Sequence, residues 1–248
     1  MNRADGELVS SNGPSLVCCL YYMSYMSFYT RRFVMERFTI QKNDFLSHDC
    51  TGYFHLYYVG YGQPGNPDYL NTLKNIFVST HPDTLRAASR QAAALMIQDI
   101  PKVMDAEGLD EAVLMAVPRS KSGMCNWQLG FKSAVRTAVK ALWDNNLSVI
   151  DGTDFIFRHT STKMTHLRKP VSNFENTGSD PYPGITKDTC DIQNEYLKGR
   201  TVILIDDIYT KTVNVDEDCI QALYDAGAAR VIFYAVAYTN RNAYKRGA

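Results

Sequence analysis

Residues 201–212 read Thr-Val-Ile-Leu-Ile-Asp-Asp-Ile-Tyr-Thr-Lys-Thr, and this stretch carries the strongest fold signal in the chain. The apolar run Val202 to Ile205 is typical of a strand that is buried on both faces of a sheet. Two adjacent acids, Asp206 and Asp207, end the run, and a loop with two hydroxyls and a lysine follows. The segment 215–226 then predicts a helix. A buried strand joined to a helix by a short loop is the repeating unit of α/β proteins.

The same alternation of strands and helices extends over most of the chain. Aromatic, β-branched and apolar runs predict the strands, and alanine-rich or amphipathic stretches predict the helices. The expected strands are 53–61, 75–79, 111–117, 153–157, 201–205 and 230–237, and the expected helices are 80–106, with a break or bend near Pro101, 126–145 and 215–226. We therefore expect a parallel sheet flanked by helices, in which ligands bind beyond the carboxyl ends of the strands. The loops after Val117, Phe157 and Ile205 are the candidates for the site.

The composition narrows the class of protein. The chain has 248 residues, of which 45% are apolar, so it can bury a substantial core and is not disordered by composition. Lysine and arginine together number 26, as do aspartate and glutamate, so the formal net charge is zero. A protein that binds nucleic acid or an anionic membrane through its overall field would carry a positive excess. A chain without net charge could bind such a partner only through a local basic site.

The cysteines and the N-terminal residues bear on the cell compartment. The six cysteines include no C-x-x-C pair, which excludes a zinc ribbon or a thioredoxin motif and favours reduced thiols in a cytoplasmic protein. The uncharged stretch 8–30 holds too many polar residues to span a membrane, and the charge order around it is the reverse of a secretory signal. We expect residues 1–50 to form an N-terminal extension whose tyrosine-rich part, 21–29, packs within the fold or against another subunit. Translation starts at Met1 or near Met35, and the sequence leaves both open.

The paired acids and the loop after them suit one kind of ligand. A loop that opens a helix presents unpaired backbone N–H groups, which bind phosphate. Adjacent carboxylates suit ribose hydroxyls or a hydrated Mg²⁺. A sugar phosphate combines both features, whereas the alternative is a strand end whose acids only face water or cap the next turn. The phosphate-loop NTPase motif G-x-x-x-x-G-K-[ST] is absent from the sequence.

The decapeptide Ile203 to Thr212 resembles the phosphoribosyl pyrophosphate (PRPP) loop of type I phosphoribosyltransferases. That loop consists of four apolar residues, two acids, two variable residues and then Thr-Thr-Gly or Thr-Ser-Gly. Leu197 to Arg200 before it, and the helix and strand that end at Tyr238-Thr239 after it, resemble the ComF-like or amidophosphoribosyltransferase-like branch. The resemblance covers residues 56–240.

This resemblance implies a type I phosphoribosyltransferase-like parallel sheet over residues 51–248, with a hood near 35–75 that holds the acceptor. Asp206 and Asp207 are the residues that it implies for catalysis. They would hold the ribose hydroxyls, and Mg²⁺ at the same two acids would bridge these hydroxyls and the pyrophosphate. The residues implied for binding the 5′-phosphate are Tyr209, Thr210, Lys211 and Thr212.

A second loop, Pro118 to Gly123, stands where this family has its pyrophosphate loop. Its two cations and two hydroxyls follow a buried strand, and such groups hold pyrophosphate by charge-assisted hydrogen bonds. The resemblance therefore implies that Arg119, Ser120 and Lys121 bind pyrophosphate. The alternative is a solvated loop with ordinary basic residues.

The segment 158–169 holds four cations, two histidines and no acid. By resemblance it is the flexible loop that closes over PRPP and excludes water, with Arg158, Lys163 and Arg168 among its cations. Closure would place Arg158 or Lys163 on the leaving group. Two alternatives stay open, a solvated basic loop and a local contact with RNA or DNA, of which the nucleic-acid contact is not favoured.

Two departures from the family pattern bear on activity. The N-terminal zinc ribbon that ComF-like proteins often carry is absent, and Thr212 stands in place of the phosphate-loop glycine. Glycine allows a positive φ and a close approach of the backbone to phosphate, both of which a β-branched residue resists. Either the hydroxyls of Thr210 and Thr212 share the phosphate, or PRPP binding is weakened or lost.

The sequence thus predicts a protein that binds PRPP, or a related ribose phosphate, with Mg²⁺ and transfers or releases the phosphoribosyl group with loss of pyrophosphate. One alternative is a catalytically degenerate member that binds a nucleotide or PRPP without turnover. Another is a regulatory or effector subunit that contacts a protein or nucleic-acid partner through its tyrosine-rich N-terminus and segment 158–169. The sequence specifies neither the acceptor nor the oligomeric state.

Overall fold

The computed structural model describes residues 35–74, 80–165 and 174–242, which all belong to one compact unit, Met35–Ala248. The short strand expected over 75–79 lies outside the described residues, as does the tyrosine-rich stretch 21–29.

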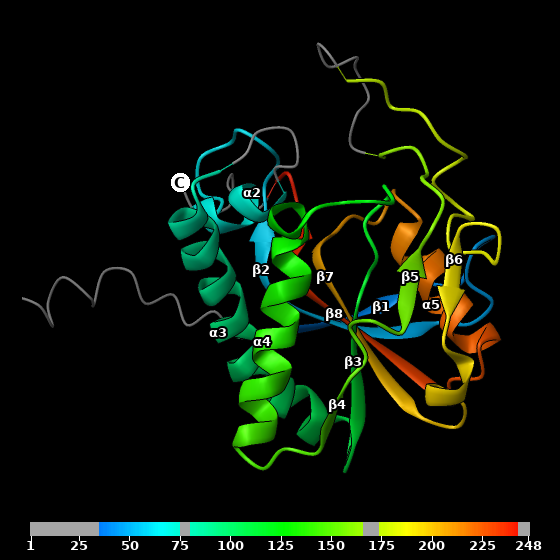
Figure 1. Ribbon diagram of the computed structural model, residues 1–248. Helices are drawn as coiled ribbons and strands as arrows, with labels where there is room; N and C mark the ends of the chain where they lie inside the picture. The colour runs from blue at the N-terminus through cyan, green and yellow to red at the C-terminus, as the bar shows by residue number, and fades with distance from the viewer. Residues whose placement is uncertain (1–34, 75–79, 166–173, 243–248) are drawn as a thin grey trace, which may run out of the picture. The chain divides into compact units, whose positions relative to one another are not determined.

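A six-stranded sheet with the strand order β1-β2-β8-β7-β3-β4 forms the centre of this unit (Figure 1). All neighbouring strands run parallel except β1, which pairs antiparallel with β2 at one edge. The expected α/β class with a mostly parallel sheet is confirmed. The strands are β1 Glu36–Ile40, β2 Cys50–Tyr58, β3 Ala112–Ala116, β4 Val149–Asp151, β7 Thr201–Tyr209 and β8 Arg230–Thr239.

Helices cover both faces of the sheet, because the central strands bury apolar side chains on both sides. In β7, Ile203 and Ile205 belong to a core shared with α2, α3 and α4, whereas Val202 and Leu204 belong to a core shared with α5. Figure 1 shows α3 and α4 on one side of the sheet, and α5 with a small second sheet on the other. The helices are α2 Asp68–Lys74, α3 Pro82–Ala106, α4 Gly130–Asp144 and α5 Val215–Asp225, with short 3-10 turns at Asn126–Leu129 and Asn194–Tyr196.

The helices follow the sequence expectation closely. Helix α3 begins at Pro82, where proline costs no hydrogen bond, and it continues through Pro101 without a break. The helix expected over 126–145 begins as a 3-10 turn and becomes α-helical at Gly130. Helix α2, by contrast, was not expected from the sequence.

The prediction that residues 153–157 form a strand of the main sheet is wrong. Thr153 lies in a turn, and β5 Ile156–Arg158 pairs antiparallel with β6 Cys190–Ile192 in a separate two-stranded sheet. The place beside β3 is taken by β4, which ends at Asp151. The chain turns there because the carboxylate of Asp151 accepts hydrogen bonds from the backbone N–H of Thr153, at 2.9 Å, and from its hydroxyl, at 2.6 Å.

The region expected as a hood, 35–75, lies partly within the main sheet. It supplies β1 and β2, which are the first two strands of that sheet, and then α2. Helix α2 packs on α3, and its residues Leu70 and Leu73 are part of the core. The described part of this region is therefore continuous with the sheet.

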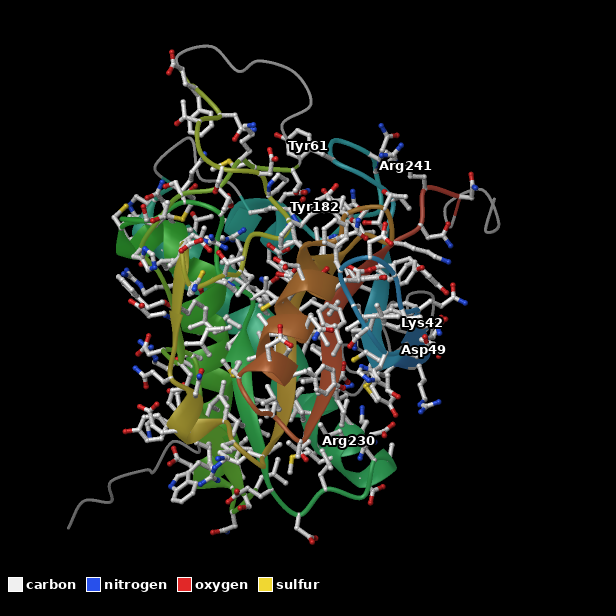
Figure 2. All side chains as sticks on the ribbon, turned by 90° about the vertical axis from the view of Figure 1, so that its right-hand side faces the viewer. Lys42, Asp49, Tyr61, Tyr182, Arg230 and Arg241 are labelled. Atoms are coloured by element: carbon white, nitrogen blue, oxygen red, sulfur yellow. The ribbon has the colours of Figure 1, made fainter. Side chains whose placement is uncertain are left out.

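The parallel strands bring their carboxyl ends to one edge of the sheet. Figure 2 shows this direction for β8: Arg230, at its start, and Arg241, just beyond its end, lie at opposite ends of the molecule. Tyr61, in the loop after β2, lies toward the same end as Arg241. In a sheet of this kind, the loops at that edge form the ligand site.

Two further observations concern the membrane and the cysteines. Within the ranges 35–74, 80–165 and 174–242, no helix is long and apolar enough to cross a membrane. The four cysteines in these ranges, Cys50, Cys125, Cys190 and Cys219, are free thiols.

Candidate functional site

A cavity of about 1320 Å³ opens at the carboxyl ends of the parallel strands. Its wall includes residues from the ends of β3, β7 and β8, from the end of α2 and from loop 118–123. Three carboxylates, those of Asp206, Asp207 and Asp216, line the cavity together with seven lysine and arginine side chains. This excess of positive charge suits a ligand with several negative charges.

Asp207 lies near the end of β7, and only 3% of its side chain is exposed. Its Oδ1 is 2.9 Å from the ammonium of Lys74, and its Oδ2 is 3.4 Å from the guanidinium of Arg119. Burial alone would raise the pKa of this carboxyl, but the positive charges of Lys74 and Arg119 outweigh burial and hold the pKa below its ordinary value. Asp207 is therefore an ionised carboxylate with a cation at each oxygen.

Asp206 has a different electrostatic environment from its neighbour in the sequence. Adjacent residues of a strand point to opposite faces, and Asp206 interacts with Asp216 in the first turn of α5. Burial, and then the negative charge of Asp207, raise the pKa of Asp206. Burial, and then the negative charge of Asp206, raise the pKa of Asp216 well above its ordinary value. Within the described part of the chain, one oxygen of Asp216, Oδ1, is buried without a hydrogen-bond partner.

The loop after β3 brings Arg119, Ser120 and Lys121 to the same cavity. Arg119 also donates to the carbonyl of Leu73 at 2.8 Å, which holds its guanidinium against the end of α2. The Lys121 ammonium donates to the carbonyl of Thr162 at 2.9 Å, and the Thr162 N–H donates to the carbonyl of Ser120 at 2.7 Å. The predicted pyrophosphate loop therefore lies beside the β7 acids and is tied to the start of the basic segment.

Arg158 holds loops together through its guanidinium. The residue is 8% exposed, and its Nε donates to the carbonyl of Arg119 at 2.6 Å. Its Nη1 donates to the carbonyl of Gly184 at 2.9 Å. Arg158 also lines the cavity, but because its Nε and Nη1 donors are committed to backbone carbonyls, its main contacts support loop 118–123.

The other two cations of the expected flexible loop are placed differently. Lys163 lines the cavity, is exposed, and pairs with Asp180 at 3.2 Å. Arg168 lies outside the described residues. The described residues 162–165 also line the cavity, so this part of the segment borders the ligand space.

Of the four residues expected to cradle a 5′-phosphate, Thr210 lines the cavity and the other three do not. Tyr209 is still part of β7, and its buried hydroxyl donates to Glu217 at 2.9 Å. Lys211 and Thr212 form an exposed turn. The backbone φ of Thr212 lies outside the left-handed region, so threonine at the position of the family glycine causes no backbone strain.

Several residues of the cavity wall were not expected from the sequence, among them Lys74, Asp216 and Thr239. Lys74 ends a helix that was not expected, and one isolated lysine forms no motif. Asp216 lies in an acidic first turn, which is typical of any helix N-terminus and so gave no distinct signal. The Oγ1 atoms of Thr239 and Thr210 lie 2.7 Å apart, a contact that depends on the pairing of β8 with β7.

The carboxylates of the cavity bear on metal binding. Within the described ranges, no group of three or more histidine, cysteine, aspartate or glutamate side chains is arranged to hold a metal ion. Mg²⁺ in phosphate-binding sites, however, is often held by one or two carboxylates, by water and by the phosphates of the substrate. The neighbouring carboxyls of Asp206 and Asp216, with the unpartnered Oδ1, fit a cation of that kind.

Comparison with known proteins finds similarity at the level of structure. No family model and no curated protein matches the chain. A hypoxanthine phosphoribosyl transferase of Trypanosoma cruzi matches with 13% identity and a TM-score of 0.34, over 60% of this chain and 73% of that chain. The asparagine mutant from an analysis of an invariant aspartic acid in HPRTs gives the same identity and TM-score, over 60% and 74%.

The allosteric regulatory enzyme of purine biosynthesis also matches, with 13% identity and a TM-score of 0.29, over 60% of this chain and 25% of that chain. These similarities are too weak to carry an argument about function.

Proposed function

We propose that this protein is a type I phosphoribosyltransferase-like enzyme that binds PRPP or a related ribose phosphate. It would transfer or release the phosphoribosyl group with loss of pyrophosphate. The observation that carries this proposal is that the acids of the PRPP-like motif, Asp206 and Asp207, share one cavity with the cations of loop 118–123. Carboxylates suit the ribose hydroxyls, and cations suit the phosphate groups.

In the proposed reaction, positive charge develops at the anomeric carbon of the ribose while pyrophosphate leaves. The acids at the end of β7 would stabilise that charge in a site shielded from water. Arg119 and Lys121 would neutralise the charge that grows on the pyrophosphate. The segment 162–165 would limit the access of water, which would otherwise compete with the acceptor.

The 5′-phosphate would lie against the ends of β7 and β8. There the hydroxyls of Thr210 and Thr239 both line the cavity, and α5 begins at Val215. These hydroxyls would form hydrogen bonds with the phosphate. Lys211 and Thr212 lie in an exposed turn and do not line the cavity. The acceptor would enter from the side of Tyr61 and Arg241, which border the same space.

Mg²⁺ is the proposed cofactor. Asp206, with Asp216 beside it, would supply carboxylate oxygens, and the phosphates of the ligand would supply the others. When bound, the ion would neutralise and orient the pyrophosphate. Asp207 is less suited to direct contact with the ion, because each of its oxygens already faces a cation.

Isothermal calorimetry with PRPP, in the presence and absence of Mg²⁺, tests this function. We expect binding that strengthens with Mg²⁺, and a thermal stabilisation of about 2.7 kcal/mol when free PRPP is 100 times its Kd. A coupled assay for released pyrophosphate then tests turnover. No binding of PRPP, ribose 5-phosphate or common nucleoside monophosphates would reject the proposal.

The residue at the family glycine position allows a sharper test of the phosphate site. We expect Thr212→Gly to leave PRPP affinity level or to raise it, because Thr212 is exposed and does not line the cavity. Thr210→Val should weaken PRPP by about fivefold, because it removes a hydroxyl from the cavity wall. Titration of both variants against PRPP measures the difference. A tenfold loss in Thr212→Gly would show instead that its hydroxyl binds the natural ligand.

A second candidate function is the binding of PRPP or a nucleotide without turnover. The exposed turn of Lys211 and Thr212 favours it, because these two residues do not contribute side chains to the phosphate end of the cavity. PRPP binding in calorimetry without release of pyrophosphate, across a panel of purine and pyrimidine bases, would select this candidate.

A further inference from the structure

Lys74 is the last residue of α2 and has no counterpart among the residues that the sequence motifs single out. Its ammonium lies 2.9 Å from Oδ1 of Asp207, which is 133 residues further along the chain. The Lys74 side chain is 30% exposed and lines the cavity. An ammonium has three N–H donors, and the carboxylate takes one of them.

Arg119 reaches the same carboxylate from the opposite side. Its Nη1 lies 3.4 Å from Oδ2 of Asp207, and its Nη2 donates to the carbonyl of Leu73, the residue before Lys74. The end of α2 therefore holds both cations in place, one through its own side chain and one through a backbone carbonyl. With one carboxylate between two cations, the group carries a net charge of +1.

We propose that Lys74 and Arg119 form a two-cation clamp for the pyrophosphate group of the ligand, with Asp207 as the residue that positions both cations. This inference rests on the proposed function, since it assigns one end of the same site. It adds Lys74, from α2, to a pyrophosphate site that the sequence motifs place on loop 118–123 alone.

The charges around the clamp favour a diphosphate over a ligand with a single negative charge. Lys121, from the same loop as Arg119, also lines the cavity, and its ammonium donates to the carbonyls of Thr162 and Thr177 and to the side-chain oxygen of Asn176. Within the described residues its contacts are thus uncharged oxygens and the ring of Phe174, whose centroid lies 5.9 Å from the ammonium, so no carboxylate there offsets its positive charge. Lys74, Arg119 and Lys121 carry three positive charges, and the paired carboxylate of Asp207 offsets one of them, which suits a group with several negative charges.

A structural role for Lys74 makes a different prediction. If Lys74 only joins α2 to β7, its removal should lower the stability of the protein and weaken all ligands of the cavity to a similar degree. If Lys74 belongs to a pyrophosphate clamp, its removal should weaken pyrophosphate selectively. A ligand without the diphosphate group separates the two roles.

The experiment compares Lys74→Met, Lys74→Arg and the control Lys140→Met by calorimetry against inorganic pyrophosphate and ribose 5-phosphate. Lys140 is an exposed residue of α4 that pairs with Asp144, so its replacement removes the same charge away from the site. We expect Lys74→Met to bind pyrophosphate at least about tenfold more weakly than the wild type, with ribose 5-phosphate affinity changed by about twofold or less. Lys74→Arg should recover part of the loss, and Lys140→Met should match the wild type.

The other outcomes would contradict the clamp, either alone or together with the proposed function. Equal weakening of both ligands in Lys74→Met would overturn the clamp and leave Lys74 a structural link. Binding of ribose 5-phosphate but not of pyrophosphate by the wild type would overturn the clamp and leave the proposed sugar-phosphate site standing. Binding of neither ligand by the wild type would overturn the proposed function and the clamp together.

Discussion

Replacement of both Asp206 and Asp207 by asparagine is expected to abolish the thermal stabilisation of the protein by PRPP and Mg²⁺. Asp206 lines the cavity next to Asp216, and Asp207 holds Lys74 and Arg119 at the cavity. Asparagine keeps the shape of each side chain but removes both negative charges. Thermal melts with and without PRPP and Mg²⁺ measure the effect, and the wild type should gain stability by mass action whereas the double variant should not.

The matched control changes two acids near the amino ends of the parallel strands, away from the cavity. Asp105 and Asp110 are exposed and lie before the start of β3, so Asp105→Asn with Asp110→Asn should keep the full ligand-induced shift. Equal shifts in the site variant and the wild type would contradict the assignment of the β7 acids to ligand binding.

Replacement of Asp99 by alanine is expected to lower the free energy of unfolding by about 3 kcal/mol. Asp99 lies in α3 and is fully buried. Its Oδ2 lies 2.7 Å from Nδ1 of His55 in β2 and accepts a hydrogen bond from the hydroxyl of Tyr234 in β8 at 3.0 Å. The variant removes the carboxylate that joins the helix to two neighbouring strands, and it leaves polar groups in an apolar core.

Urea denaturation measures this effect, with Asp105→Ala as the control in the same helix. Asp105 is exposed, so its replacement should change the free energy of unfolding by no more than about 0.5 kcal/mol. If Asp99→Ala also lowered the free energy of unfolding by no more than about 0.5 kcal/mol, the contacts of Asp99 with His55 and Tyr234 would contribute little to stability.

The pH dependence of the Asp99 variant follows from its pKa. Burial would raise the pKa of Asp99, but the hydrogen bond and charge of His55, the hydroxyl of Tyr234 and the charge of Lys102 outweigh burial and hold the pKa below its ordinary value. A carboxyl with a lowered folded-state pKa stabilises the protein above its unfolded-state pKa, about 3.9, and loses that contribution as the pH falls through the folded-state pKa. The stability difference between wild type and Asp99→Ala should therefore be largest near neutral pH and should shrink below about pH 4.

The strands that are buried on both faces were predictable from local sequence. Strands β3, β7 and β8 appear in the sequence as continuous apolar runs because nearly every side chain along them packs into one of the two cores. Strands β4 and β6, with three residues each, have no such run. Each exists because a partner strand pairs with it, β3 in one case and β5 in the other, and this pairing is not visible in a short window of sequence.

The position of the cavity was also predictable, but the residues that line it were only partly so. The apolar run before Asp206 and the one before loop 118–123 predict two strands of one parallel sheet, whose carboxyl ends meet at one edge. The cavity lies at that edge. Lys74 could not be predicted, because its contact with the site depends on how α2 packs beside β7 and not on spacing within a motif.

The sequence by itself determined which segments form the buried strands and that two adjacent acids end one of them, because apolar periodicity and strand order are local properties of the chain. Only the tertiary structure decided that these two acids have different electrostatic surroundings. Alternation along β7 directs Asp207 toward α2 and Asp206 toward α5. Helix α2 brings the cation Lys74 to Asp207, and α5 brings the carboxyl of Asp216 to Asp206. Helix α2 is distant from β7 in the sequence, and α5 follows β7 after a loop, so both contacts depend on how the helices pack. The physical reason is that the charge around a buried carboxylate is set by its neighbours in space.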